Sequence, residues 1–174
     1  MILLEFVYKH YNFAIKNGNP KLSQDQYFSL FEPTVDWLFQ CIGFNANRQT
    51  FARVYELYEA NPKKAIYLKS IIQYFPSEII ASAATALMTT VKEHYINNDD
   101  QLLIIKEMGL AFLRSPPKKQ QPKLDFLNFG WDIMNKSKNP DSYMDCGIIL
   151  VEFAIKNLTS GSVNVFIKEI FKKF

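Results

Sequence analysis

The sequence is poor in the residues that turn-rich folds, disulfide frameworks and metal sites require. Only 6 glycines and 8 prolines occur among 174 residues, which argues against a loop-rich all-β fold. The two cysteines, Cys41 and Cys146, are far apart and have no potential metal-binding or catalytic partner at short spacing. We therefore predict that both are reduced core thiols of an intracellular protein. The two histidines, His10 and His94, also lie outside any cluster of potential ligands.

Long hydrophobic runs and catalytic motifs are missing as well. No apolar run approaches the ~20 residues that a membrane-spanning helix needs. The first residues lack a basic region and their apolar run ends at Glu5, so a signal peptide is not expected. Neither an HExxH motif, a Ser/His/Asp order nor a glycine-rich phosphate loop is present. The sequence thus predicts no enzyme, no cofactor, no metal site and no small-molecule substrate.

Charge gives no sign of nucleic-acid binding. The formal net charge is only +3, and Lys and Arg alternate with Asp and Glu along the chain. One basic pair, Lys118-Lys119, lies in a polar segment, residues 115–122, that we expect to be an exposed loop. Such a pair could bind an acidic partner, but a charge pair in a loop is usually only solvated, so it is not predicted as a site.

Apolar residues dominate what is present, at 48% of the chain with 15% aromatics, which is enough for a substantial core. Every segment between turns has helical periodicity, and none alternates as a strand does. The separating turns contain proline or glycine: Gly18-Asn19-Pro20, Glu32-Pro33, Asn61-Pro62, Phe75-Pro76, Ser115-Pro116-Pro117, Gln121-Pro122 and Asn139-Pro140. The pattern predicts an all-α chain of about nine helices in one helical-repeat domain, residues 1–174.

Two all-α architectures fit these helices. Short turns between neighbouring helices, whose apolar faces pairs alone cannot cover, favour an α-solenoid of HEAT-like antiparallel helix pairs. A compact bundle is the competing architecture, because no fixed sequence repeat is evident. The expected helices include residues 2–17, 47–60, 62–75, 77–95 and 159–174, together with a very apolar one at 33–43.

Residues 27–44 form the most apolar stretch. Four residues recur at helical spacing on one face: Val35, Leu38, Phe39 and Ile42. Trp37, Cys41 and Phe44 widen this face almost all round, so we expect a helix covered on several sides. Pro33 lacks an N–H, which predicts a helix break before it. Asp36 would then lie in the first turn of the new helix, where the dipole favours an acid.

Three blocks of this sequence resemble one known family. The first follows the pattern Tyr27-x-Ser29-Leu30-x-x-Pro33-x-x-Asp36-Trp37-x-Phe39-Gln40-Cys41. The second is looser and includes Ser70-Ile71-Ile72-x-x-Phe75, Glu78-x-Ile80-Ala81, Gly109-Leu110, Pro116-Pro117 and Leu127-Asn128-x-x-Trp131. The third runs Lys136-x-Lys138-Asn139-Pro140-x-x-Tyr143-x-x-Cys146, with Glu152-Phe153, Lys156, Thr159, Val163 and Asn164 after it. In order and spacing these blocks resemble the vacuolar-protein-sorting thirty-five-like family, the large subunit of retriever in the Commander assembly.

The resemblance implies a non-catalytic scaffold that is cytoplasmic and peripheral on endosomes, with indirect membrane association. It implies arrestin-like and phosphoesterase-fold retriever subunits and coiled-coil copper-metabolism-domain proteins as partners, and recycling of membrane cargo to the cell surface. Because family members are several times longer, the chain is expected to be an interior segment of the solenoid. The alternative is a free-standing helical interaction module unrelated to trafficking.

The resemblance gives no binding site, because the residues selected from the matching pattern fall on apolar helix faces. We therefore predict that these residues pack in the core: Pro33, Trp37, Cys41, Trp131, Pro140, Tyr143 and Cys146.

Overall fold

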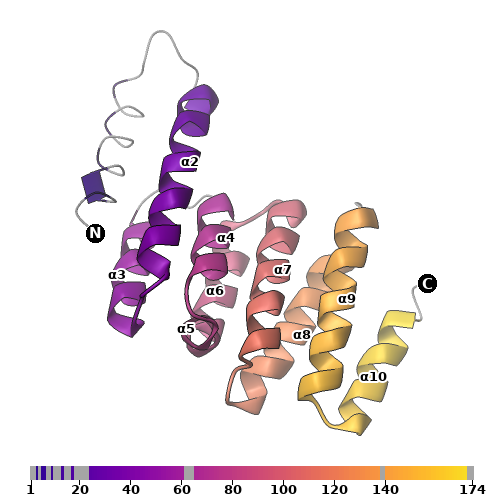
Figure 1. Cartoon of the computed structure of the whole chain (residues 1–174). Coiled ribbons are helices and arrows are strands. Elements are labelled where there is room, and N and C mark those ends of the chain that lie inside the picture. The colour runs from indigo at the N-terminus through magenta and orange to yellow at the C-terminus, as the bar shows by residue number, and fades with distance from the viewer. Residues whose placement is uncertain are drawn as a thin grey trace. The chain divides into compact units, whose positions relative to one another are not determined.

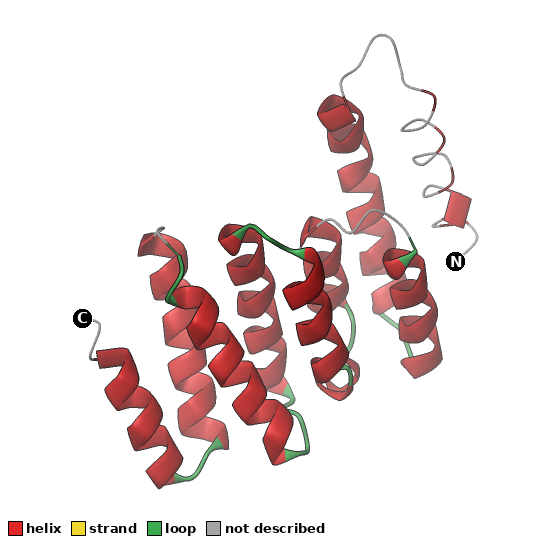
Figure 2. Cartoon of the chain, turned by 180° about the vertical axis from the view of Figure 1, so that it is seen from behind, coloured by secondary structure: helices red, strands yellow, loops and turns green. Residues whose placement is uncertain are grey.

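The computed structural model describes residues 3, 5, 6, 9, 13, 17, 24–60, 65–137 and 140–171. Within these residues there are nine helices, α2 to α10, and no strand (Figures 1 and 2). The predicted all-α, solenoid-like fold class is therefore confirmed. The predicted helix over residues 2–17 lies mostly outside the described residues. The chain divides into two compact units, Met1–Ile79 and Ile80–Phe174.

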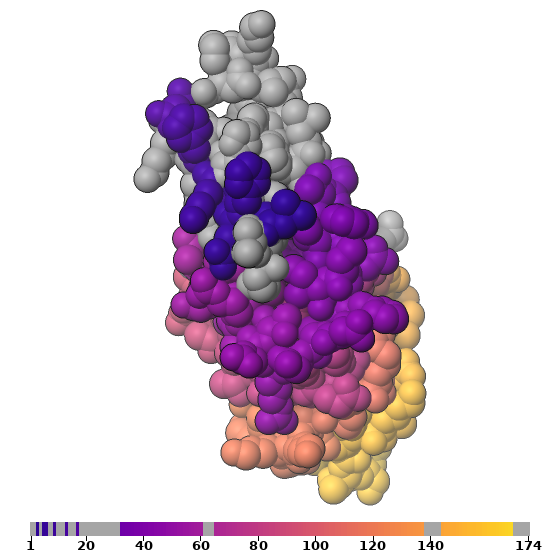
Figure 3. Space-filling model, turned by 60° about the vertical axis from the view of Figure 1, so that its left-hand side comes forward, coloured from indigo at the N-terminus to yellow at the C-terminus, as the bar shows by residue number. Residues whose placement is uncertain are grey.

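The first unit contains α2 (Gln24–Gly43), α3 (Arg48–Glu59) and α4 (Ala65–Tyr74), and α5 (Ser77–Ser82) spans the boundary. Figure 3 looks onto the surface of this unit, shown in purple. Helix α2 packs against α4, and Phe39 meets Tyr67 edge-on with ring centroids 6.4 Å apart. The start of α3 is capped by Asn47, whose side-chain oxygen accepts a hydrogen bond from the Thr50 N–H at 2.8 Å.

The break predicted at Pro33 is wrong, because α2 continues through it as one helix of 20 residues. Proline removes one backbone hydrogen bond from the helix, yet the helix continues on both sides of it. Asp36 consequently lies inside the helix and not in its first turn. Its carboxylate accepts hydrogen bonds from two α4 hydroxyls, Ser70 Oγ and Tyr74 Oη, the latter at 3.0 Å.

Removing the Asp36 carboxylate should loosen the contact between α2 and α4. Asp36→Ala is expected to lower the free energy of unfolding by about 1–2 kcal/mol, since Tyr74 Oη loses this acceptor and the buried Ser70 Oγ is left with the Ile66 carbonyl as its acceptor. Thr34→Ala, on the exposed side of the same helix, should change it by less than about 0.5 kcal/mol. Urea titrations of both variants provide the measurement, and equal midpoints for the two would contradict the role given to Asp36.

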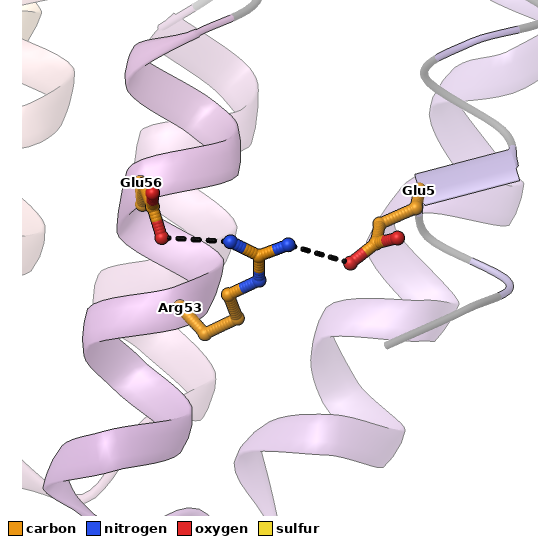
Figure 4. A network of polar contacts seen from close by, with 3 residues as sticks. All are labelled: Glu5, Arg53 and Glu56. Carbon is orange, nitrogen blue, oxygen red and sulfur yellow. Dashed lines mark hydrogen bonds and ion pairs between the residues drawn. The ribbon is translucent and has the colours of Figure 1, made fainter.

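An exposed ion-pair network joins α3 to the N-terminal part of the chain (Figure 4). The Arg53 guanidinium donates to Glu56 at 2.9 Å within α3 and to Glu5 at 3.1 Å. The hydrogen bond to Glu56, and then that to Glu5, raise the pKa of Arg53 above its usual value. Because Arg53 and Glu56 are well exposed, the network contributes little to stability, but it fixes residue 5 beside α3.

The second unit contains α6 (Ala84–His94), α7 (Asn98–Arg114), α8 (Gln120–Met134), α9 (Pro140–Asn157) and α10 (Ser160–Phe171). Helices α7 and α9 lie side by side, α6 and α8 pack behind them, and α10 packs on α9 (Figures 1 and 2). A hydrogen bond of 3.0 Å from Asn98 Nδ2 to the Lys136 carbonyl joins the start of α7 to the end of α8. These two helices are therefore antiparallel neighbours.

Three phenylalanines from three helices form the centre of this unit. Phe112 of α7, Phe126 of α8 and Phe153 of α9 are all fully buried. The ring of Phe126 lies nearly perpendicular to both others, with centroid distances of 4.9 Å to Phe112 and 5.3 Å to Phe153. Edge-to-face contacts of this kind add to the hydrophobic stabilisation of burial. The triad therefore fixes the positions of α7, α8 and α9 relative to one another.

Two predicted boundaries in this part of the chain differ from the structure. The helix predicted over residues 77–95 is divided at Ala83, whose backbone leaves the helical conformation with φ −97° and ψ 6°. No glycine or proline marks this break in the sequence. The loop predicted over residues 115–122 is shorter, because α8 already begins at Gln120. Pro117, within this shorter turn, is buried.

Candidate interaction surfaces

The described residues hold no cluster of potential metal ligands. No group of three or more His, Cys, Asp or Glu side chains in this part of the chain could hold a metal ion. His94 is exposed, and His10 lies outside the described residues. None of the described helices is both long enough and apolar enough to cross a membrane. The candidate functional features are therefore exposed surfaces that could contact other macromolecules.

The first surface is an apolar stripe on α2, and it corrects three core predictions. Trp37 is 56% exposed, Phe44 is 84% exposed, and both Cys41 and Pro33 are exposed as well. These residues follow one another at helical spacing, and we call them the α2 stripe. Prediction of Trp37, Cys41 and Pro33 as core residues was wrong. Among the described helices α2 has one extensive packing neighbour, α4.

The other residues that were predicted to pack in the core belong to the second unit. Trp131 of α8 is half-buried, and its ring meets that of Phe166 of α10 at 6.2 Å. Cys146 of α9 is 1% exposed and belongs to the core. Pro140 is the first residue of α9, but its side chain and that of Tyr143 lie outside the described part of the structure.

The two cysteines differ in chemistry because they differ in burial. Burial raises the pKa of the Cys146 thiol to about 12, an effect that nearby Lys106 opposes and Asp145 reinforces. A thiol with so high a pKa holds almost no reactive thiolate at neutral pH. Cys41 is exposed on the α2 stripe, so it is the accessible one of the two.

Thiol titration provides a direct check of this difference. In the native protein we expect a thiol reagent to modify Cys41 rapidly and to leave Cys146 unmodified, with both reacting in denaturant. Cys41→Ser should abolish the rapid reaction, which would assign that reaction to the Cys41 thiol. Rapid modification of the Cys41→Ser variant under native conditions would contradict the burial of Cys146.

A second apolar stripe lies on α9. Met144, Ile148 and Ile155 are all exposed, Ile148 by 62%, on the side of α9 away from buried Leu150 and Phe153. We call these three residues the α9 stripe. Helical periodicity identified the buried side of this helix, but it did not indicate that an apolar surface would also remain on the other side. The spacing of seven residues between Ile148 and Ile155 is the one sequence signal for it.

The third surface is basic and surrounds the turn between α7 and α8. Arg114 ends α7, Lys118 and Lys119 form the turn, and Lys123 lies in the first turn of α8. No acid occurs in the sequence between Glu107 and Asp125. We call these four residues the basic turn.

The observed class is an all-helical protein of packed helix pairs whose notable features are exposed faces. A family model described as the VPS35L C-terminal domain matches residues 46–174. The chain belongs to this family. The sequence resemblance suggested an interior segment of the family's solenoid. The matching model describes the family's C-terminal domain, so residues 46–174 are similar to that domain.

Curated relatives extend the similarity over most of the chain. The human protein "VPS35 endosomal protein-sorting factor-like" is 29% identical over 147 residues, covering 84% of this chain and 15% of that protein. The Dictyostelium discoideum protein of nearly the same name is 25% identical over 152 residues, covering 87% of this chain and 15% of its own length. A Drosophila melanogaster relative is 23% identical over 155 residues, covering 88% and 16%. The chain thus spans about 15% of the length of the curated relatives it matches.

Proposed function

We propose that this chain is a non-catalytic scaffold segment that acts in endosomal protein sorting. The observation that carries the proposal is the family match over residues 46–174, with relatives whose names state an endosomal sorting role. The physical character of the described residues supports it. Their buried side chains serve helix packing, and their exposed features are apolar and basic surfaces suited to contacts with other proteins.

The more specific proposal is a role in a retriever-like complex that returns membrane cargo from endosomes to the cell surface. Its partners would be arrestin-like and phosphoesterase-fold subunits together with coiled-coil copper-metabolism-domain proteins. The chain would then be cytoplasmic and peripheral on endosomes, held there by its partners. This proposal rests on the sequence resemblance, and the exposed α2 and α9 stripes support it by offering apolar area for protein contacts.

A scaffold works by holding its exposed faces at fixed positions. The Phe112, Phe126 and Phe153 triad holds α7, α8 and α9 rigidly, so the α9 stripe is presented on a fixed backbone. In the first unit, Asp36 ties α2 to α4 and thereby orients the α2 stripe. A prearranged surface loses little conformational entropy on binding, which favours affinity.

Affinity purification and imaging test the two levels of this proposal separately. The tagged chain is expressed in cells, its co-purified proteins are identified by mass spectrometry, and its position relative to endosomes is recorded. Endosomal localisation supports the sorting role, and recovery of retriever subunits or copper-metabolism-domain proteins supports the specific one. Recovery of other helical proteins alone, away from endosomes, would contradict both and favour a free-standing interaction module. The tag expressed alone is the control.

A further inference from the structure

The basic turn concentrates positive charge more strongly than any other described feature of the second unit. Its four cations fall within ten consecutive positions that contain no acid, whereas the whole chain has a net charge of only +3. Arg114, Lys118 and Lys119 are exposed, and Lys123 is half-exposed. The rest of the chain is therefore close to neutral or slightly acidic, and the positive charge of this protein is largely a local property.

The structure also places these cations at one end of one helix pair. Because α7 and α8 are antiparallel, the end of α7 and the start of α8 adjoin, which brings Arg114 and Lys123 to the same end as the turn lysines. Buried Pro117 anchors the turn in the core, so the two lysines after it extend from a fixed backbone. Sequence alone indicated only a solvated lysine pair in a longer loop.

The three lysines of the basic turn form no ion pair with an acid of the described structure. Asp125, the next acid along the chain, accepts a hydrogen bond from Gln121 Nε2 at 2.7 Å. The acids Asp99 and Asp100 lie at the start of α7, at the opposite end of the pair. Beside the turn, the four cations face one nearby acid in the sequence, Asp125, and this local excess of positive charge attracts a negative partner.

We propose that the basic turn binds an acidic, Asp- or Glu-rich segment of a partner protein. Carboxylates form charge-assisted hydrogen bonds with Lys and Arg, and a flexible acidic segment can reach the three lysines around the turn. The positive end of the α8 helix dipole adds to the attraction. This inference is independent of the function proposed above, since it depends only on the residues around the turn.

An anionic membrane is the competing partner, and the turn is poorly suited to it. Surface-binding elements usually combine cations with aromatic or aliphatic side chains that insert among the lipids. Here the residues of the turn are Ser115, two prolines and two lysines, and Pro117 is buried. Electrostatic attraction of about four cations alone gives only weak, reversible membrane binding.

The test measures binding of a fluorescein-labelled oligoglutamate peptide to the intact chain by fluorescence anisotropy at low ionic strength. The variant combines Lys118→Glu with Lys119→Glu. The matched control combines Lys136→Glu with Lys168→Glu, which changes the net charge equally at exposed positions away from the turn. Circular dichroism verifies that both variants remain folded. Sedimentation with phosphatidylcholine vesicles, with and without phosphatidylserine, measures the membrane alternative in parallel.

We expect the turn variant to weaken peptide binding by about tenfold or more, and the control by less than about twofold. Added salt should weaken the wild-type interaction, because the contacts are exposed. Equal loss in both variants would overturn the proposal, since net charge alone would then explain the binding. Failure of the wild-type chain to bind the peptide would also overturn the proposal. This holds even if the chain binds phosphatidylserine vesicles through the turn.

Discussion

Phe126→Ala is expected to lower the free energy of unfolding by about 3–5 kcal/mol, because it removes the central ring of the aromatic triad. Phe126 is fully buried, and its ring contacts both Phe112 and Phe153. Truncation leaves a cavity among three helices whose backbones are already in close contact, so the neighbouring side chains can fill little of it. Urea titration followed by circular dichroism gives the change in unfolding free energy. A loss of this size is a large fraction of the stability of an ordinary domain.

Trp37→Ala is the matched control, since it also truncates an aromatic residue within a helix. Trp37 is 56% exposed on the α2 stripe, so its removal should change the unfolding free energy by less than about 1 kcal/mol. Comparable losses in the two variants would mean that Trp37 is covered in the folded protein. The same variant is useful in partner studies, because an exposed tryptophan is a frequent centre of binding energy.

For α2, the helical periodicity of apolar residues predicted one feature of burial correctly and another incorrectly. It correctly identified the side that is buried, with Val35, Leu38 and Phe39 in the core. It overestimated the width of that side, because Trp37 and Cys41 are apolar and yet exposed. Periodicity reports which residues could be buried, whereas the number of packing neighbours decides which of them are. A sequence alone does not give that number.

Local turn signals were less reliable than the helical pattern. Pro33 predicted a break that does not occur, and Ala83 marks a break that no local signal predicted. Packing between helices can outweigh the helix preference of a single residue, which differs by at most about 3 kcal/mol among residue types. The existence of helices was therefore predictable from the sequence, while the boundaries at Pro33, at Ala83 and at the start of α8 were not.

The candidate surfaces were the least predictable feature. The family could be identified from spaced residues, but Trp37 and Cys41 within that signature lie on a surface and Cys146 lies in the core. Only the packed structure separates these two kinds of position. The basic turn likewise required the antiparallel packing of α7 and α8, because a sequence shows charges in order but not at which end of a helix pair they meet.

Gly109→Val should destabilise the second unit by about 3 kcal/mol, the upper part of the range for overpacking. Gly109 lies within α7, against α9, and a Cβ atom at this position would meet Ile149 Cγ2 at only 2.3 Å. That methyl group is attached directly to the β-carbon of a nearly buried residue, so it cannot move without shifting the side chain as a whole. The ring of Phe126 would lie 3.4 Å from the same Cβ, which limits adjustment on a second side.

Gly161→Val provides the matched control, because it makes the same substitution in another helix of the same unit. A Cβ at Gly161 meets nothing within 4 Å, so the change is free of steric conflict. Valine has a somewhat better helix propensity than glycine. The free energy of unfolding of this variant should therefore lie within about 0.5 kcal/mol of the wild-type value or slightly above it. If both variants unfold at the urea concentration of the wild type, α7 and α9 are not in close contact at Gly109. If only Gly109→Val is destabilised, α7 and α9 can pack closely because residue 109 has no side chain. The position of α9, and therefore of the α9 stripe, then depends on this glycine.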